Sequence, residues 1–546
     1  MKVVLLALSS RYIHLSPAPY YLAAALGNMP ATVLDHSVGE PKEKILADIL
    51  DEKPDVLGLS VYIWNISLLK SLIPEIKRSL PETLIVLGGP EVSYNVAETL
   101  TLFPYTPILS GEGEVPFLRL VEALKAGAPF DTVPACSYIK KDGSMHLSEP
   151  YIGTETPKSP RFAGYAEALK GRIAYIEASR GCPFACAFCL SGRCGGVRYF
   201  DMESVKADIL ALGKVSRMVK FIDRTFNADR GRALDIFRFI LSHYGGDIPK
   251  GTCFHFEIAG ELLDEETLLF LENAPHGVFR FEIGIQSFHS PTLKAIHRSP
   301  NTEKLLNNIQ RLTRKGNVIV HVDLIAGLPK EDLATFKESF NTAYALSPHM
   351  LQLGFLKLLH GAPMREKREL YPCEYKADPP YEVTSTPWLS EKDLQALHTA
   401  EHALDRFYNS HRYTRTLSLW KREPFELFLL LGQALQNAKD PLTLDEEISL
   451  IYHFFANAGI EESTLRDALL LDFLATNSSR LTPTVLRRED KRLKAIKGTL
   501  AERFPVKSGT RRAVALLRDG QAAFVDYTEK DPVSGEYPLA ILSIPI

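Results

Sequence analysis

Four cysteines lie close together in the segment EASRGCPFACAFCLSGRC, which begins at Glu177. Cys182, Cys186 and Cys189 follow a C-x3-C-x2-C spacing, and Cys194 lies outside it. Structural zinc sites usually pair one C-x2-C with a second, distant pair of ligands, and this chain has no such pair. Three thiolates from one loop favour a [4Fe-4S] cluster with one iron free of protein ligands. We expect Cys194 to be a bystander, with a substrate or redox role as the alternative.

Length and composition predict a protein of several domains without a strong bias towards nucleic acid or membranes. The 546 residues are 45% apolar and 24% charged, with a formal net charge of -3. No run of about 18 apolar residues is present, and the first apolar run, Val3 to Leu8, is too short for a signal peptide. We therefore expect a cytoplasmic protein, in which thiols stay reduced. Its cysteines are odd in number, seven, and clustered, which does not indicate a disulfide framework.

The first part of the chain, residues 1–130, alternates apolar runs with amphipathic helical patterns. The runs that predict strands are 3–8, 32–36, 56–62, 84–89 and 107–111. Continuous apolar strands that alternate with helices predict a doubly wound, Rossmann-like parallel sheet.

Unusual residues follow these strands at their carboxyl ends, where ligands of such sheets bind. Glycines there would let the backbone approach a bulky ligand closely, although tight turns between strand and helix also use Gly and Pro. The candidate ligand-binding residues are Ser9, Ser60, Tyr62, Gly88, Gly89, Pro90, Glu91, Gly111, Glu112, Gly113 and Glu114.

The rest of the chain divides into three further parts. Residues 131–170 are rich in Pro, Gly and Ser and predict a linker with a hairpin at 140–144. Residues 171–365 alternate again and predict a partial (β/α)6 TIM-type barrel, with chemistry at the carboxyl ends of its strands. Its predicted strands are 172–179, 218–223, 252–259, 278–287, 318–327 and 351–359. The overall fold class is therefore α/β.

Residues 366–546 predict a mostly helical domain that ends in a small β segment. Ser390 and Asp393 are placed to cap the helix that follows them. Between Arg480 and Arg518, twelve Lys and Arg stand against three acids. Such a basic segment, 480–518, can contact phosphates of RNA or of a charged metabolite, but we favour a solvated helical face.

The cysteine motif, with the aromatic Phe188 before its last cysteine, resembles the signature of radical S-adenosylmethionine (SAM) enzymes. It directly follows the first predicted barrel strand, as in that family. The resemblance implies that the free iron binds SAM and that the reduced cluster cleaves it to methionine and a 5′-deoxyadenosyl radical. It also implies an electron donor of the flavodoxin or ferredoxin type.

Other segments resemble the SAM-binding strands of that family. In KFIDRTFN (220–227), Asp223 and Asn227 would end the second barrel strand. Glu257 would lie on the fourth strand, and 281–298 and 322–331 would include the fifth and sixth. The resemblance implies that Gln286 and Ser287 face the barrel interior and that Arg298 meets the methionyl carboxylate. Each residue has a hydrogen-bonded structural role as its alternative. The implied SAM-binding residues are Phe188, Asp223, Glu257, Gln286, Ser287 and Arg298.

The segments GGPEVS (88–93) and GEGE (111–114) resemble the cobalamin-binding domain of cobalamin-dependent radical SAM enzymes. The resemblance covers roughly residues 1–365 and implies cobalamin as the ligand of the N-terminal domain. Mutase-type domains ligate cobalt through D-x-H-x-x-G, whereas this chain has Asp35 directly before His36. We expect His36 to be a loop residue and cobalt to lack a lower protein ligand, which should favour release of a methyl group as a radical.

These expectations point to methylation of an unactivated carbon on a small-molecule or RNA substrate. The segment 366–546 resembles an uncharacterised extension and indicates no substrate. A cobalamin-dependent rearrangement or cyclisation without methyl transfer is the first alternative. A tRNA-modifying, methylthiotransferase-like enzyme is the second, although the remaining cysteines are too scattered for a second cluster. A non-catalytic cobalamin sensor is the third, and it would not need the three cysteines.

Overall fold

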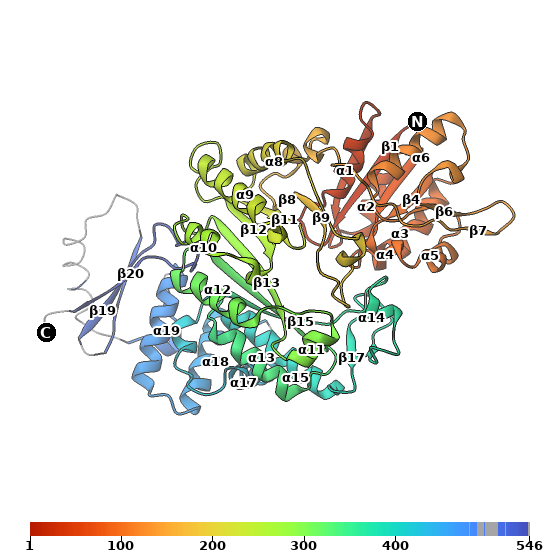
Figure 1. Cartoon of the computed structure of the whole chain (residues 1–546). Coiled ribbons are helices and arrows are strands. Elements are labelled where there is room, and N and C mark those ends of the chain that lie inside the picture. The colour runs from red at the N-terminus through yellow and green to blue at the C-terminus, as the bar shows by residue number, and fades with distance from the viewer. Residues whose placement is uncertain (440, 480, 489–495, 497–510, 519, 544–546) are drawn as a thin grey trace.

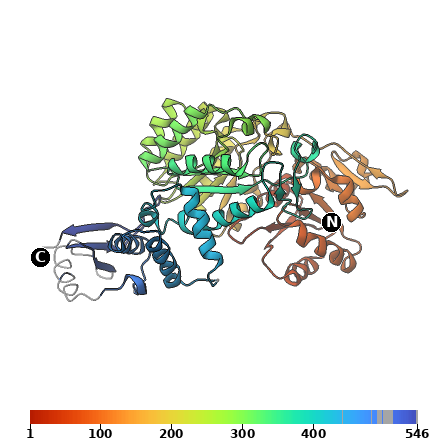
Figure 2. The ribbon, with the colours of Figure 1, turned by 90° about the horizontal axis from the view of Figure 1, so that it is seen from below.

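The computed structural model describes residues 1–439, 441–479, 481–488, 496, 511–518 and 520–543. An N-terminal sheet domain, a central partial barrel and a C-terminal helical region follow one another along the chain (Figure 1). The N-terminal domain and the small C-terminal sheet lie at opposite ends of the molecule (Figure 2). This confirms the predicted α/β fold class. None of the helices within the described ranges is both long and apolar enough to cross a membrane.

The N-terminal sheet has the strand order β2-β1-β3-β4-β5-β6-β7, and its first five strands are parallel. Every residue of β1 is buried, as expected for a sheet covered on both faces. The order reverses between β1 and β3, which places a ligand crevice above their carboxyl ends. The parallel strands are β1 (Val3–Ser9), β2 (Ala31–Ser37), β3 (Val56–Ser60), β4 (Leu84–Gly88) and β5 (Ile108–Leu109).

Helices cover both faces of this sheet and bury two separate apolar clusters. Helices α2 (Lys42–Glu52) and α3 (Ile66–Ser79) pack on one face. Helices α1 (Ala18–Ala25) and α6 (Glu114–Ala126) pack on the other. The short helices α4 (Pro90–Ser93) and α5 (Val96–Leu102) follow β4. The sheet is therefore doubly wound.

The sheet extends beyond residue 130 into the predicted linker. Strand β6 (Cys136–Ile139) pairs antiparallel with β5, and β7 (Met145–His146) pairs with β6. The predicted hairpin turn is present, since the backbone N–H of Lys140 donates to the carbonyl of Ser144 at 2.8 Å. Sequence reasoning placed β6 in the linker because it is short and flanked by turn residues.

Six parallel strands form the barrel sheet in the order β8-β11-β12-β13-β14-β15, at the positions that the apolar runs predict. Glu257 lies on the third barrel strand, and β13 and β14 are the fourth and fifth, so the strand numbers taken from the resemblance were one too high. The strands are β8 (Ala174–Ile176), β11 (Met218–Phe221), β12 (Cys253–Ile258), β13 (Phe279–Gln286), β14 (Ile319–Ala326) and β15 (Met350–Phe355).

Alternation along β13 separates an outer apolar face from an inner polar face, which we call the lumen. The ring of Phe281 lies 5.6 Å from that of Phe237 on the outer helix α9 (Arg230–His243). The intervening residues Glu282, Gly284 and Gln286 therefore face the lumen. The other outer helices are α8 (Met202–Val215), α10 (Glu265–Glu272), α11 (Ser290–Ala295), α12 (Thr302–Lys315) and α13 (Leu333–Ala345).

The C-terminal helices pack against the barrel through α13. The ring of Phe340 on α13 lies 5.4 Å from Phe425 and 5.9 Å from Phe428 on α17. Ser390 and Asp393 form the predicted capping box of α15. The helices are α14 (Pro363–Glu366), α15 (Glu391–Ala403), α16 (Thr414–Leu417), α17 (Pro424–Gln436), α18 (Leu444–Asn457) and α19 (Glu462–Thr476).

Short strands complete the C-terminal region. The hairpin of β16 (Glu374–Tyr375) and β17 (Val383–Ser385) precedes α15. The final sheet contains β18 (Arg512–Leu516), β19 (Gln521–Asp526) and β20 (Leu539–Ser543). Much of the basic segment lies outside the described residues, namely Arg480, Lys491, Arg492, Lys494, Lys497, Arg503 and Lys507.

Candidate active site

The three cysteines of the motif lie in the loop after β8, which also carries the strand β9 (Ser179–Gly181). Each is partly buried, and burial raises the pKa of the Cys186 thiol to about 11. Their sulfur atoms do not all lie within 4.8 Å of one another. Ligands of one tetrahedral zinc ion would be about 3.8 Å apart. As they lie, the three thiols are therefore not spaced to share one tetrahedral zinc ion.

Contacts to neighbouring segments fix the shape of this cysteine loop. The backbone N–H of Ala187 donates to the carbonyl of Ile296, and its own carbonyl accepts from Met364. A Cβ on Gly192 would lie 2.7 Å from the carbonyl oxygen of Phe184, so only glycine fits there. The Sγ of Cys182 lies 3.2 Å from the hydroxyl of Thr225. The loop is therefore held by the barrel and by the segment after β15.

Two of the residues predicted to bind SAM are hydrogen-bonded within the protein. Asp223 is 2% exposed and accepts from the Ala178 backbone N–H and from the Ser179 hydroxyl. Burial raises its pKa to about 7. Ser287 is also buried and donates its hydroxyl to Glu331 at 2.5 Å. Both side chains hold neighbouring loops, which was the structural alternative for them.

Gln286, Arg298 and Cys186 lie near one another. A Cβ on Gly284 would lie 2.3 Å from the Gln286 Nε2 and 3.8 Å from the Arg298 Nη1. The positive charge of Arg298 acts on the Cys186 thiol and opposes the burial that raises its pKa. The Oε1 of Gln286 is buried without a hydrogen bond to any described residue. An amide without a partner beside a cationic group fits a ligand at this position.

Phe188 and Glu257 occupy different surroundings. Phe188 is partly buried and packs against the barrel core. Glu257 faces the lumen, where Arg224 approaches it at 3.4 Å and Lys220 at 3.8 Å. Burial raises the pKa of Glu257 despite these two cations.

The lumen also contains a layer of titratable side chains that sequence reasoning did not select, contributed by β11, β12, β13 and β14. The sequence contained a pattern that indicates these residues, because charged residues and histidines recur at every second position of otherwise apolar strands. The layer comprises Lys220, His255, Glu282, His321 and Asp323, and it adjoins Glu257.

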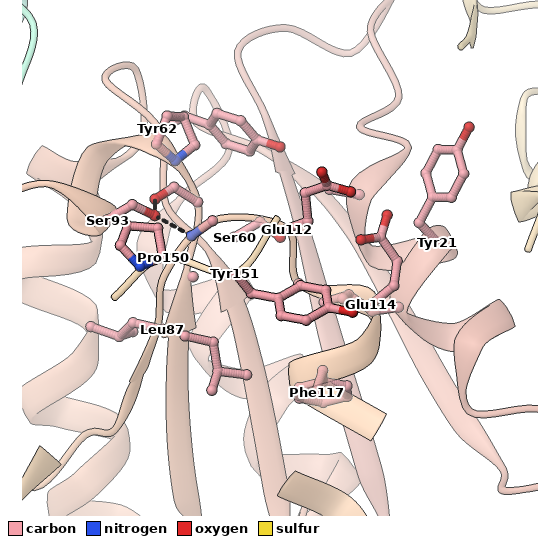
Figure 3. Close-up of a pocket in the computed structure, with 18 of the residues that line it drawn as sticks. Tyr21, Ser60, Tyr62, Leu87, Ser93, Glu112, Glu114, Phe117, Pro150 and Tyr151 are labelled. Atoms are coloured by element: carbon pink, nitrogen blue, oxygen red, sulfur yellow. Dashed lines mark hydrogen bonds between the residues drawn. The ribbon is translucent and has the colours of Figure 1, made fainter. Parts of the chain in front are cut away.

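A cavity of about 620 Å³ opens at the carboxyl ends of the N-terminal strands (Figure 3). It is lined by nine of the candidate residues: Ser60, Tyr62, Gly88, Gly89, Pro90, Gly111, Glu112, Gly113 and Glu114. Ser9 and Glu91 are not among the lining residues. Its inner part lies between strand ends and helices, with Leu22, Gly58 and Phe117 in its wall. A mainly apolar cavity of this volume with a few polar side chains is typical of a site for a cofactor or another small molecule.

Two glycines shape the rim of this cavity. Gly89 and Gly111 have φ of 110° and 84°, which favour glycine. A Cβ on Gly89 would lie 2.5 Å from the carbonyl oxygen of Val61, and one on Gly111 would lie 2.3 Å from that of Tyr151. The hydroxyl of Ser93 joins the two glycines, since it donates to Gly89 and accepts from the Gly111 N–H. The glycines thus allow close packing of the cavity wall.

The lining residues of the cavity include no histidine among those that the structure describes. His36 lies at the end of β2, not in a loop, and its two ring nitrogens lie 3.2 Å from Glu40 and 3.3 Å from Asp48. The imidazole of His14 lies 2.5 Å from the Tyr175 hydroxyl. Neither histidine lines the cavity. Tyr62 does, and its ring stacks on Trp64 at 4.2 Å.

The GEGE segment joins the N-terminal domain to the barrel. Arg180, just before the cysteine motif, lies 2.7 Å from Glu112, 2.6 Å from Glu114 and 2.7 Å from Glu177. Arg198 also binds Glu112, at 2.6 Å. The two glutamates therefore line the cavity while their carboxylates pair with arginines of the barrel, a partner that sequence reasoning did not identify.

Glu91 contacts the C-terminal region, away from the cavity. Its buried carboxylate accepts a hydrogen bond from the Tyr381 hydroxyl, and the guanidinium of Arg365 lies 4.5 Å from the Tyr381 ring. The neighbouring Asn95 lies 3.4 Å from His360. The segment after β15 thus holds the short helix that forms one side of the cavity rim.

Comparisons with known proteins find three families that match successive parts of the chain. The B12 binding domain family matches residues 3–121, the radical SAM superfamily matches 176–343, and a protein family of unknown function (DUF4080) matches 369–510. The cobalamin-dependent radical SAM methyltransferase TokK of Streptomyces tokunonensis is 25% identical over 58% of this chain and 49% of its own length. The 2-(S-pantetheinyl)-carbapenam-3-carboxylate methyltransferase of Streptantibioticus cattleyicolor is 26% identical over 56% and 47%.

This chain spans about half the length of those two curated relatives. Among solved structures, the cobalamin-dependent SAM radical enzyme OxsB with aqua-cobalamin and SAM bound has a TM-score of 0.61, with 16% identity over 93% of this chain and 82% of its own. The radical SAM methyltransferase TsrM from Kitasatospora setae has a TM-score of 0.56, with 17% identity over 66% and 74%. The chain thus contains a B12-binding domain followed by a radical SAM domain, and the cofactors of these two domains are cobalamin, a [4Fe-4S] cluster and SAM.

Proposed function

We propose that this enzyme methylates an unactivated carbon atom of a small organic substrate. When bound, SAM at the cluster supplies a carbon-centred radical, and cobalamin supplies the methyl group. The chain's own residues hold the two cofactors and exclude water. Cys182, Cys186 and Cys189 would hold the cluster, and the cavity at the carboxyl ends of β3, β4 and β5 would hold cobalamin.

The proposal rests on one observation: the same short peptide segment borders both cofactor sites. Leu190, Ser191 and Arg193 line the cobalamin cavity, and they directly follow Cys189 along the chain. The Ser191 N–H even donates to the Cys189 sulfur at 3.4 Å. One short peptide therefore borders both sites, so a substrate in the barrel mouth would face both the radical source and the methyl donor.

The predicted SAM contacts belong to this proposal. Glu257, Gln286 and Arg298 line or adjoin the open side of the barrel, and Phe188 lies in the cysteine loop. Asp223 and Ser287 would support the site through Ser179 and Glu331, with no direct contact to SAM. An electron donor of the flavodoxin or ferredoxin type would supply the electron for SAM cleavage.

A cyclisation without methyl transfer is a second candidate. An anaerobic magnesium-protoporphyrin IX monomethyl ester cyclase of Rubrivivax gelatinosus is 24% identical over 57% of this chain and 57% of its own length. That similarity supports a ring closure as the reaction of this chain, without transfer of a methyl group.

Product analysis separates the two candidates. The reconstituted enzyme is incubated without oxygen with reduced flavodoxin, cobalamin, cell metabolites and SAM that is deuterated in its methyl group. Methyl transfer predicts a metabolite that carries the deuterated methyl, together with equal amounts of 5′-deoxyadenosine and S-adenosylhomocysteine. Cyclisation predicts 5′-deoxyadenosine without S-adenosylhomocysteine. Absence of both SAM products would reject catalysis of either kind.

A further inference from the structure

Three potential metal ligands converge on the lumen side of β13 and β14. Glu282 stands opposite His321 in the strand register, and Gly284 stands opposite Asp323. One ligand atom from each of Glu282, His321 and Asp323 lies within 4.8 Å of the other two. Because Gly284 has no side chain, it leaves space beside Asp323 on the lumen side. This group is distinct from the three cysteines of the barrel mouth.

His321 and Asp323 approach each other without a hydrogen bond. The His321 Nε2 and the Asp323 Oδ1 are 2.8 Å apart, yet each lacks a hydrogen-bond partner among the described residues. The oxygen therefore lies off the direction in which the ring nitrogen donates. The His321 side chain is only 6% exposed, so water reaches it poorly. A buried imidazole nitrogen without a partner requires an explanation.

A shared metal ion explains this arrangement. Two ligands at right angles on one ion, with bonds of about 2.1 Å, are about 3 Å apart. In that geometry the oxygen lies well off the axis of the nitrogen lone pair, because the ion occupies that axis.

Glu282 can provide the third ligand, because one of its carboxylate oxygens is held in place and the other is free of hydrogen bonds from the described residues. Its Oε2 accepts from the Nε2 of His255 at 2.9 Å and from Lys220 at 3.1 Å. Its Oε1 has no hydrogen bond to a described residue. The hydrogen bond from His255 would orient the Glu282 carboxylate as a metal ligand.

We propose that the barrel lumen binds one divalent metal ion through Glu282, His321 and Asp323, separately from the iron–sulfur cluster. One imidazole and two carboxylates are ligands for Zn²⁺, Mn²⁺ or Fe²⁺ in preference to soft, thiolate-seeking ions. Lys220 offsets part of the negative charge, so the site holds a single divalent ion with water in its remaining positions. The site depends only on the fold and not on the methyl transfer proposed above.

Titration of the holoenzyme with Mn²⁺ tests this site. With the cluster oxidised and cobalamin as Co(III), both cofactors are silent in electron paramagnetic resonance, so loss of the free Mn²⁺ signal reports binding. We expect one Mn²⁺ per chain, displaced by Zn²⁺. Both His321→Gln and Asp323→Asn should weaken binding by more than about tenfold, since loss of even an outer-shell partner costs about 10–100-fold in metal affinity.

A matched control distinguishes binding by the three ligands from attraction of the ion to the negative charge of the lumen as a whole. Glu257→Gln removes one lumen carboxylate without touching the three ligands, so it should bind Mn²⁺ as the unmodified enzyme does. Cluster and cobalamin contents are measured in every variant, and His321→Gln with both contents intact provides the decisive comparison. The proposal is overturned if the holoenzyme binds neither Mn²⁺ nor Zn²⁺, if Glu257→Gln weakens binding as much as Asp323→Asn does, or if His321→Gln binds normally.

Discussion

Arg180 of the barrel and Glu114 of the N-terminal domain form an ion pair of 2.6 Å, which joins the residue two positions before Cys182 to the GEGE segment. Both side chains are mostly buried, and the pKa of Arg180 lies well above its usual value, because the carboxylates of Glu177 and Glu114 outweigh the effect of burial. The distance between the cobalamin cavity and the cysteine loop therefore depends on this contact.

Replacing Arg180 should loosen that junction. Arg180→Gln leaves buried carboxylates without their cation, and we expect the free energy of unfolding to fall by about 3–5 kcal/mol. Cobalamin retention after gel filtration should fall as well. Urea denaturation and cobalt content measure the two effects. The control is Arg119→Gln on α6, whose exposed pair with Glu122 should contribute less than about 1 kcal/mol. An equal loss of unfolding free energy in both variants would show that Arg180 contributes no more to stability than an exposed ion pair does.

Alanine at Cys182, Cys186 or Cys189 should abolish the cluster and with it the formation of 5′-deoxyadenosine. Alanine at the buried Cys253 or at Cys194 should preserve both, since neither belongs to the motif. Iron and sulfide content, together with product analysis under dithionite, provide the measurement. An intact cluster in Cys186→Ala would contradict the assignment of the ligands.

Gly111→Ala should weaken cobalamin binding by about tenfold or more, because the new Cβ would lie 2.3 Å from the Tyr151 carbonyl oxygen at the cavity wall. Gly127→Ala is the matched control, since Gly127 also has a positive φ, of 67°, but has nothing within 4 Å of the added carbon. Both variants carry backbone strain of about 1–3 kcal/mol. Only the first should change the affinity in an equilibrium titration with hydroxocobalamin.

Glu331 should make stability depend on pH. Burial raises its pKa to about 7 from 4.5, so the folded protein holds a proton that the unfolded chain has released between those values. Its contribution is complete below pH 4.5 and is lost as the pH rises through about 7. The loss amounts to at most about 3 kcal/mol. Urea denaturation from pH 5 to pH 8 should show a flatter profile for Glu331→Gln, whereas the exposed Glu338→Gln on α13 should retain the slope of the unmodified protein.

Cobalt in this enzyme should lack a nitrogen ligand from the protein on its lower face. The cavity lining contains no histidine among the described residues, and His36 is held by Glu40 and Asp48. Electron paramagnetic resonance of the Co(II) form should show no superhyperfine splitting from nitrogen. A splitting that disappears in His36→Ala but persists in His14→Ala would assign a ligand that the structure does not place there.

Local sequence pattern predicted most of the architecture, because continuous apolar strands and a helix cap depend on neighbouring residues. The barrel strand at 278–287 and the capping box of Ser390 and Asp393 are examples. The pairing of β6 with β5 was missed, since a strand of four residues has too short a pattern.

Such local patterns could not predict contacts between segments that are distant along the chain. Glu112 and Glu114 follow a strand as predicted, but their arginine partners lie 66 or more positions away along the chain. Glu91 was expected near a ligand, yet its partner is Tyr381 in another domain. The lumen layer likewise arises only when four strands stand side by side. Charge at alternate positions within buried strands is the signal that would have revealed it.

The hydrogen bond between Glu91 and Tyr381 means that the region matching a family of unknown function is not an appendage to the enzyme. A protein truncated after the barrel would lose the Tyr381 hydroxyl that binds the Glu91 carboxylate on the short helix at the cavity rim. Fragments that lack the last third of the chain are therefore poor substitutes for the whole chain in binding experiments. If such a fragment failed to bind cobalamin, the result would not show that the cavity is unsuited to it.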